Sequence, residues 1–205
     1  MSISGNVYGV VLNDTEELER LAPEFGQQPY STPPNAPVVY MKPRSALAKC
    51  DIPRAPEPLV CAPTIALLMS RDTVKQSAST ALSNVGAVAI AVDVSLPQAS
   101  YYRPAIAQKN ADCFLALGDW AAPSYPDIVS TEINGVAAHE WRLERLHRSP
   151  AELLADLSEF MTLKAGDVLL IGLPGDAPHA IAGDRLRIDA GDLPSLEISI
   201  ARGAS

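Results

Sequence analysis

The placement of proline is the feature that most restricts how this chain can fold. Its 205 residues include 18 prolines, and these concentrate between residues 29 and 63. Proline fixes φ, lacks an amide donor and keeps the preceding residue away from helical geometry. The sequence therefore predicts extended segments and turns over 29–63, and a proline-rich loop over 22–37.

Apolar patterns elsewhere predict many short strands. The strand-like segments are 6–12, 37–42, 59–69, 86–94, 167–174, 184–190 and 196–202. We expect Pro63 to break the third of them, because proline cannot donate to a sheet ladder. The Asn134-Gly135 pair lies between two strand-like runs in 127–142 and predicts a hairpin.

Two or three helices are predicted between these strands. The clearest covers 149–161, where Ser149 and Glu152 form a capping box and Pro150 occupies the first helical position. Its expected apolar face consists of Leu153, Leu154, Leu157, Phe160 and Met161.

A short helix after Asn13 or Asp14 would carry Leu18 and Leu21, and another would cover 72–84 with Asp72 as its N-cap. Strands and helices do not alternate regularly, so a doubly wound sheet is not expected. The prediction is a single α+β, mostly-β domain over residues 1–205.

Composition limits the partners and the compartment. The net charge is −8 and the pI about 4.8, without a Lys/Arg cluster, so neither nucleic acid nor an anionic membrane is an expected partner. No apolar run approaches the ~20 residues of a membrane span, and the first residues lack a signal-peptide pattern. The three cysteines show no C-x-x-C spacing, which favours a reduced, cytoplasmic protein.

The segment DVSLPQASYYRPAIAQKNADCF, residues 93–114, contains the candidate site. Asp93 ends an apolar strand, and its carboxylate could bind a metal, cap the next turn, or pair with Lys109 or Arg103. Tyr102 and Arg103, with the preceding tyrosine, could bind an anion through hydroxyl and guanidinium donors, or the tyrosines could simply pack.

The three histidines lie at 139, 147 and 179, and none is spaced with another ligand as in a metal site.

A set of motifs spread in order over nearly the whole chain resembles the fumarylacetoacetate hydrolase family. The motifs are GVVLN, PVVYMKPRSAL, DVSLP, SYYRPAIAQK, TEING, LLADLSEFMTLKAGDVLLIGLP and AGDRLRI. The resemblance implies a mixed, largely β roll with few helices. It also implies chemistry on small 2-oxo acids that enolise on Mg²⁺ or Mn²⁺, because a chelated cation stabilises the developing enolate.

Within the family, the motifs are most similar to one half of members that act in 4-hydroxyphenylacetate catabolism. Those members decarboxylate 5-oxopent-3-ene-1,2,5-tricarboxylate and isomerise 2-hydroxyhepta-2,4-diene-1,7-dioate. The resemblance places a family metal-binding E-x-E pair at Ala62 and Thr64, and a third metal ligand at Asp93. Two of three carboxylates are thus absent, which weakens the expected metal binding.

The resemblance also matches Lys109 to a family active-site lysine, and Tyr102 and Arg103 to a shared Y-Y-R-P run. A family catalytic histidine falls at about Glu17.

Three functions remain open at this point. The chain could be a subunit of the isomerase/decarboxylase with a degenerate metal site, acting with a second subunit of the family or as a homodimer. It could be an autonomous, metal-free isomerase in which Lys109 moves a proton on a 2-hydroxydiene dicarboxylate. It could also be a non-catalytic 2-oxo-acid-binding protein of the same fold.

Overall fold

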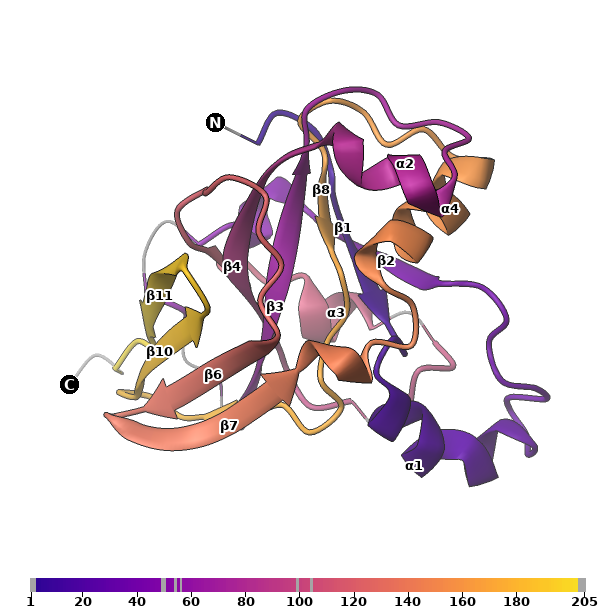
Figure 1. Cartoon of the computed structure of the whole chain (residues 1–205). Helices are drawn as coiled ribbons and strands as arrows, with labels where there is room; N and C mark the ends of the chain where they lie inside the picture. Colours follow the sequence, from indigo (N-terminus) through magenta and orange to yellow (C-terminus); the bar gives the residue numbers. More distant parts are fainter. Residues whose placement is uncertain are drawn as a thin grey trace.

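The computed structural model describes residues 3–48, 51–53, 55, 57–98, 100–103 and 105–202. In these residues two β-sheets meet around the main core, and three of the four α-helices lie to one side of the strands in Figure 1. The predicted α+β, mostly-β class is confirmed.

The larger sheet carries the candidate site. Its strands, in spatial order, are β2 (Val38–Lys42), β1 (Val7–Val11), β8 (Val168–Leu170), β3 (Leu59–Met69), β4 (Val85–Ser95) and β5 (Leu115–Leu117), with β9 (His179–Ala180) also paired to β3. β1 and β8 pair in parallel, whereas the other neighbouring pairs are antiparallel. The sequence patterns did not predict β5 and β9, which have only three and two residues.

The smaller sheet contains the predicted hairpin. Its order is β11 (Leu193–Ser199), β10 (Arg185–Ala190), β6 (Ile128–Ile133) and β7 (Val136–Arg142). Asn134 and Gly135 connect β6 to β7 with φ of 54° and 78°, the left-handed pair that a tight hairpin turn requires. Figure 1 shows β6 and β7 as a long curved ribbon along one edge of the molecule.

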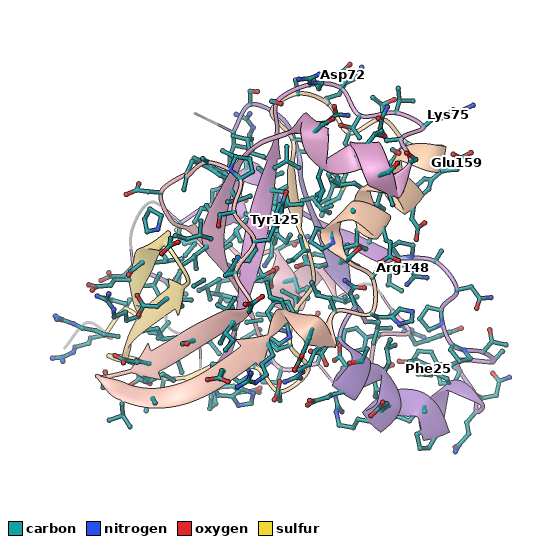
Figure 2. All side chains as sticks on the ribbon, viewed as in Figure 1. Phe25, Asp72, Lys75, Tyr125, Arg148 and Glu159 are labelled. Carbon is teal, nitrogen blue, oxygen red and sulfur yellow. The ribbon has the colours of Figure 1, made fainter. Side chains whose placement is uncertain are left out.

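The main core lies where the two sheets and α4 (Pro150–Phe160) meet. Ile90 on β4 and Trp141 on β7 are both fully buried there. Leu153, Leu154 and Leu157 of α4 are also fully buried, as the capping box and apolar spacing predicted. Phe160 is 68% exposed, so its assignment to the buried face was wrong. Side chains fill the interior between the strands (Figure 2).

The expected break at Pro63 does not occur, because β3 is continuous from Leu59 to Met69. The N–H groups of Cys61 and Met69 donate to Pro178 and Asp167, on the side of β3 opposite β4. Pro63 is two residues after Cys61, and every second residue of a strand directs its backbone N–H to the same side. The position where Pro63 lacks an N–H therefore also faces away from β4. There it falls between the short pairings with β9 and β8, where no ladder bond is lost.

The helices differ from the prediction at their ends. They are α1 (Thr15–Phe25), α2 (Ala78–Ala81), α3 (Ile106–Lys109) and α4, with 3₁₀ turns at Arg44–Ala46, Leu82–Asn84 and Leu143–Arg145. α1 begins after the predicted N-cap Asp14 but continues through Pro23, into the expected loop.

Asp72 is not a helix N-cap, because α2 begins only after Ser77. Asp72 instead accepts hydrogen bonds from Lys164 Nζ and the Ala165 N–H.

None of the helices in the described ranges is long and apolar enough to cross a membrane. Cys50, one of the three cysteines, lies outside the described residues.

The hairpin turn gives a direct test of this fold. We expect Gly135→Ala to lower the free energy of unfolding by about 1 kcal/mol, because a side chain at φ +78° is strained. Gly26→Ala is the matched control, since Gly26 has φ −83° and open space around it. Urea denaturation of both variants measures the difference, and equal losses would contradict the turn geometry.

Candidate functional site

Asp93 lies near the end of β4, between two neighbouring strands of the larger sheet. Its register partners are Ala62 on β3 and Leu115 on β5. The residue is fully buried, although it carries a carboxylate. A buried charge of this kind requires close partners, because desolvation is costly.

Two lysines and a tyrosine supply those partners. Lys109 Nζ lies 2.9 Å from Oδ1 of Asp93, and Lys42 Nζ lies 3.2 Å from the same oxygen. The Tyr40 hydroxyl donates to Oδ2 at 2.5 Å. Both carboxylate oxygens are therefore occupied by groups of this chain. Of the alternatives open from the sequence, Asp93 pairs with Lys109, and Arg103 is not its partner in any described contact.

Lys42 is locked into the sheet. Its Nζ donates to the carbonyls of Val94 at 3.0 Å and Phe114 at 2.9 Å, and also to the carbonyl of Lys109. The side chain is fully buried. Lys42 therefore acts as a fixed positive charge that ties β2 to β4 and to the segment that follows it.

Sequence reasoning did not assign a role to Tyr40 or Lys42. The sequence pattern that could have identified them is their spacing of two residues, which places both side chains on the same face of β2. Gly9 on β1 is opposite Tyr40, and a Cβ there would lie 2.1 Å from the tyrosine ring. Glycine at this position thus lets the Tyr40 ring cross β1 and reach Asp93.

The cluster perturbs the acidity of its members. Burial alone would raise the pKa of Asp93, but Lys109, Lys42 and the hydrogen bond from Tyr40 outweigh it and hold the pKa below the ordinary 3.8. Burial lowers the pKa of Lys42 from 10.5 to about 8, against the attraction of Asp93. Burial, together with Asp93, raises the pKa of Tyr40 well above 10. At pH 7 Asp93 is accordingly a carboxylate, and Lys42 is mainly an ammonium group.

Positions 62 and 64 on β3 do not supply metal ligands. Ala62 has no donor atom, and the Thr64 hydroxyl is committed to the Gly172 carbonyl at 2.6 Å. Throughout the described ranges, no group of three or more His, Cys, Asp or Glu side chains is placed to hold a metal ion.

A cavity of about 450 Å³ lies beside the cluster, between β2 and the segment that contains α3. It brings Tyr102, Arg103 and Lys109 together, three of the four predicted site residues. Tyr102 is 54% exposed and packs edge-to-face on Tyr30, with ring centroids 6.0 Å apart. Asp93 lies behind this cavity and does not line it.

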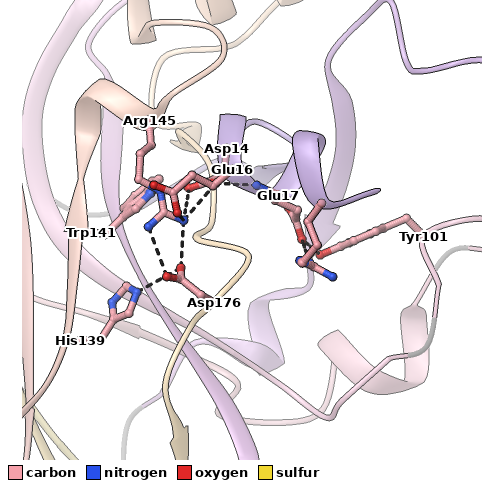
Figure 3. Close-up of polar contacts among 9 residues, drawn as sticks. Asp14, Glu16, Glu17, Tyr101, His139, Trp141, Arg145 and Asp176 are labelled. Carbon is pink, nitrogen blue, oxygen red and sulfur yellow. Dashed lines mark hydrogen bonds and ion pairs between the residues drawn. The ribbon is translucent and has the colours of Figure 1, made fainter. Parts of the chain in front are cut away.

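A second cavity of about 360 Å³ lies next to α1. Glu17, Arg20, Tyr101 and Lys109 are among its lining residues, and Tyr101 and Lys109 line the first cavity as well. The Tyr101 hydroxyl donates to Oε1 of Glu17 at 2.7 Å (Figure 3). Tyr101 is thus a partition between the two cavities, and Lys109 reaches both.

Polar contacts fix the start of α1 to the smaller sheet. Asp14 caps α1 through the Glu17 N–H at 2.9 Å and accepts from Trp141 Nε1 at 2.8 Å. Arg145 bridges Asp14 and Asp176, each at 3.0 Å (Figure 3). The buried start of α1, and with it Glu17, is therefore held in one position.

His139 completes this network. Its side chain is only 8% exposed, although most of β7 is exposed, and it contacts Asp176 at 3.2 Å.

Comparison with known proteins gives one family and a common fold. The sequence matches "Fumarylacetoacetate (FAA) hydrolase C-terminal" over residues 6–201. It is 38% identical over 200 residues to the 4-hydroxyphenylacetate degradation bifunctional isomerase/decarboxylase of Salmonella dublin. That alignment covers 95% of this chain and 47% of the relative, so the chain spans about half the length of that protein.

Two solved structures share the fold. Fumarylpyruvate hydrolase from Pseudomonas aeruginosa, in complex with Mn²⁺ and pyruvate, aligns with a TM-score of 0.81 and 17% identity over 97% of this chain and 90% of that one. The 2-hydroxyhepta-2,4-diene-1,7-dioate isomerase from Mycobacterium marinum aligns with 0.80 and 23%, over 100% of this chain and 77% of that one. At these identities the likeness establishes the fold alone.

The buried cluster predicts a large effect on stability. Asp93→Asn should lower the free energy of unfolding at pH 7 by about 3–5 kcal/mol, because two buried lysines lose their counter-ion. Asp93 has a depressed folded-state pKa, so its contribution is present above 3.8 and is lost as pH falls below that value. Urea denaturation measures the free energy of unfolding of the wild type and of Asp93→Asn at pH 7 and at pH 3. The difference between the two proteins should be smaller at pH 3 than at pH 7.

Asp156→Asn is the control for this comparison. Asp156 pairs with Arg148 at 3.0 Å, but its side chain is 46% exposed, and we expect a much smaller loss. An equal loss for both variants would mean that the buried cluster is no more important than a surface ion pair.

Proposed function

The chain belongs to the fumarylacetoacetate hydrolase family, as its motifs predicted, and on that premise we propose that it is one unit of an isomerase/decarboxylase of 4-hydroxyphenylacetate (homoprotocatechuate) catabolism. The reactions proposed are decarboxylation of 5-oxopent-3-ene-1,2,5-tricarboxylate and isomerisation of 2-hydroxyhepta-2,4-diene-1,7-dioate. The 38% identity to a named bifunctional enzyme, over nearly the whole chain, supports this assignment. We take residues 1–205 as a single domain of that enzyme.

Family members bind Mn²⁺ or Mg²⁺, but the donor set around Asp93 does not fit such an ion. A hard divalent cation requires several oxygen ligands, usually with more than one carboxylate. Here one carboxylate is available, and ammonium groups lie 2.9 and 3.2 Å from it. These two short distances are the basis of our proposal that Lys42 and Lys109 take the place of a metal ion in this chain.

We infer a partner with its own metal ligands, because this chain lacks a suitable set of donors and spans only about half of its relative. The relative is about twice as long as the aligned region, which leaves room in it for a second unit of similar size. We propose that this chain acts with a second subunit of the same family, or as a homodimer, and that the metal-dependent step takes place in a metal-competent unit. The role of this chain is then to complete the assembly and support the partner's site.

One observation favours a second function, a metal-free isomerase. Lys109 lines both cavities, and its ammonium group has three donors, of which one goes to Asp93. The remaining donors could stabilise an enolate oxygen without a metal. A non-catalytic 2-oxo-acid-binding protein is the outcome if neither the chain nor its assembly turns over substrate.

Metal titration tests the donor-set argument. Isothermal titration of Mn²⁺ into the wild-type chain should show no stoichiometric site, because two fixed ammonium groups repel a cation at Asp93. Asp93→Asn is the control, since weak heat from surface carboxylates would persist in it. A single tight site in the wild type that disappears in Asp93→Asn would contradict the proposal.

Turnover of the 2-hydroxydiene dicarboxylate, followed by ultraviolet absorbance, distinguishes the two functions. The half-unit proposal predicts turnover only after a metal-competent family subunit is added with Mg²⁺. The metal-free alternative predicts turnover by the chain alone in EDTA. If the metal-competent subunit is equally active with and without this chain, the half-unit proposal is wrong.

A further inference from the structure

The cavity of about 450 Å³ beside β2 carries positive charge, and no acidic residue is among the described residues that line it. Arg103 and Lys109 lie in its wall, although the whole chain has a net charge of −8. Lys109 already pairs with Asp93, whereas Arg103 is exposed and makes no hydrogen bond or ion pair with any other described residue. The planar guanidinium of Arg103 is therefore available to bind a carboxylate from outside the chain.

The rest of this wall is mainly apolar. Val39 on β2 and Ile106 on α3 lie in it, together with Met41, and the last two are 65% and 49% exposed respectively. Tyr102 adds an exposed aromatic ring. A ligand with a ring would cover this apolar surface, because aromatic groups pack on tyrosine in stacked or edge-to-face arrangements. The volume lies within the usual range of small-molecule sites, about 300–1,000 Å³.

Asn110 provides an unused hydrogen-bond acceptor in the same wall. It follows α3, and its Oδ1 is buried without a hydrogen-bond partner among the described residues. A small rotation of the amide about χ2 would let a ligand hydroxyl satisfy this oxygen. Gln98 Oε1 is also buried and unpartnered, but the amide of Gln98 is held by a hydrogen bond to Tyr101. Asn110 is therefore the better acceptor for a ligand.

We propose that this cavity binds a small aromatic carboxylate that carries a hydroxyl group on its ring. The carboxylate pairs with Arg103, the ring lies against Tyr102 and Ile106, and the hydroxyl donates to Oδ1 of Asn110. Tyr101 separates this site from the cavity beside α1. The proposal goes beyond the function proposed above and does not depend on it.

NMR titration of the full chain with 4-hydroxybenzoate tests the site, because this compound has the carboxylate, the ring and the hydroxyl. We expect saturable shifts of the backbone amide signals of β2 and α3, with a Kd on the order of 1 mM or lower. Arg103→Gln should weaken binding about tenfold or more, because it removes a charge-assisted pair. Arg20→Gln is the matched control and should bind as wild type, since Arg20 lines the other cavity and its side chain is 58% exposed.

Two analogues test the two polar contacts separately. 4-Hydroxybenzamide has nearly the same shape without the charge, so it should bind more weakly, and equally to the wild type and Arg103→Gln. Benzoate lacks the hydroxyl and should bind the wild type about three- to tenfold more weakly than 4-hydroxybenzoate. Asn110→Ala removes an oxygen that has no partner, so the fold should be retained, and this variant should bind the two acids equally.

Weaker binding by Arg103→Gln, with unchanged binding by Arg20→Gln, supports the proposal. Equal affinity of the wild type and Arg103→Gln for 4-hydroxybenzoate would overturn it, and so would shifts that do not saturate. Weaker binding by Arg20→Gln alone would place the ligand in the cavity beside α1 and would also overturn it. If Asn110→Ala still prefers 4-hydroxybenzoate to benzoate as the wild type does, the contact between the hydroxyl and Asn110 is wrong.

Discussion

The buried ion pairs of Asp93 are the interaction on which the rest of this site depends. One carboxylate, fully enclosed, satisfies Lys42 and Lys109 at once and also accepts from Tyr40. Neither lysine could remain charged at this depth without it, because an unpaired buried ion is strongly disfavoured. The cluster joins β2, β4 and α3, so the walls of both cavities are fixed by the same few contacts.

The buried cluster also determines the net charge around Asp93. Ala62 lies directly across from Asp93, where a carboxylate would add a second negative charge. With alanine there, Asp93 and two ammonium groups give a local net positive charge instead. A cation is then disfavoured, while an anionic oxygen near Lys109 is favoured. In physical terms, the site carries fixed positive charge beside its one carboxylate.

Much of the fold could be predicted from sequence because its signals are local. The Asn134-Gly135 turn and the capping box of α4 depend on a few adjacent residues, and both were predicted correctly. Pro63 was misjudged because its effect depends on where β8 and β9 end, which is a tertiary property. The site follows the same rule. Asp93 and Lys109 were identified from one segment, whereas Lys42 enters from a distant strand whose register no local pattern reveals.

The most direct test of the ion pairs at Asp93 is a crystal structure of the chain soaked in Mn²⁺, with anomalous diffraction recorded for manganese. We expect no anomalous peak beside Asp93, and we expect Nζ of Lys42 and of Lys109 within hydrogen-bonding distance of its carboxylate. A peak at coordinating distance from Asp93, with either lysine displaced, would contradict the claim that ammonium groups replace a metal ion here.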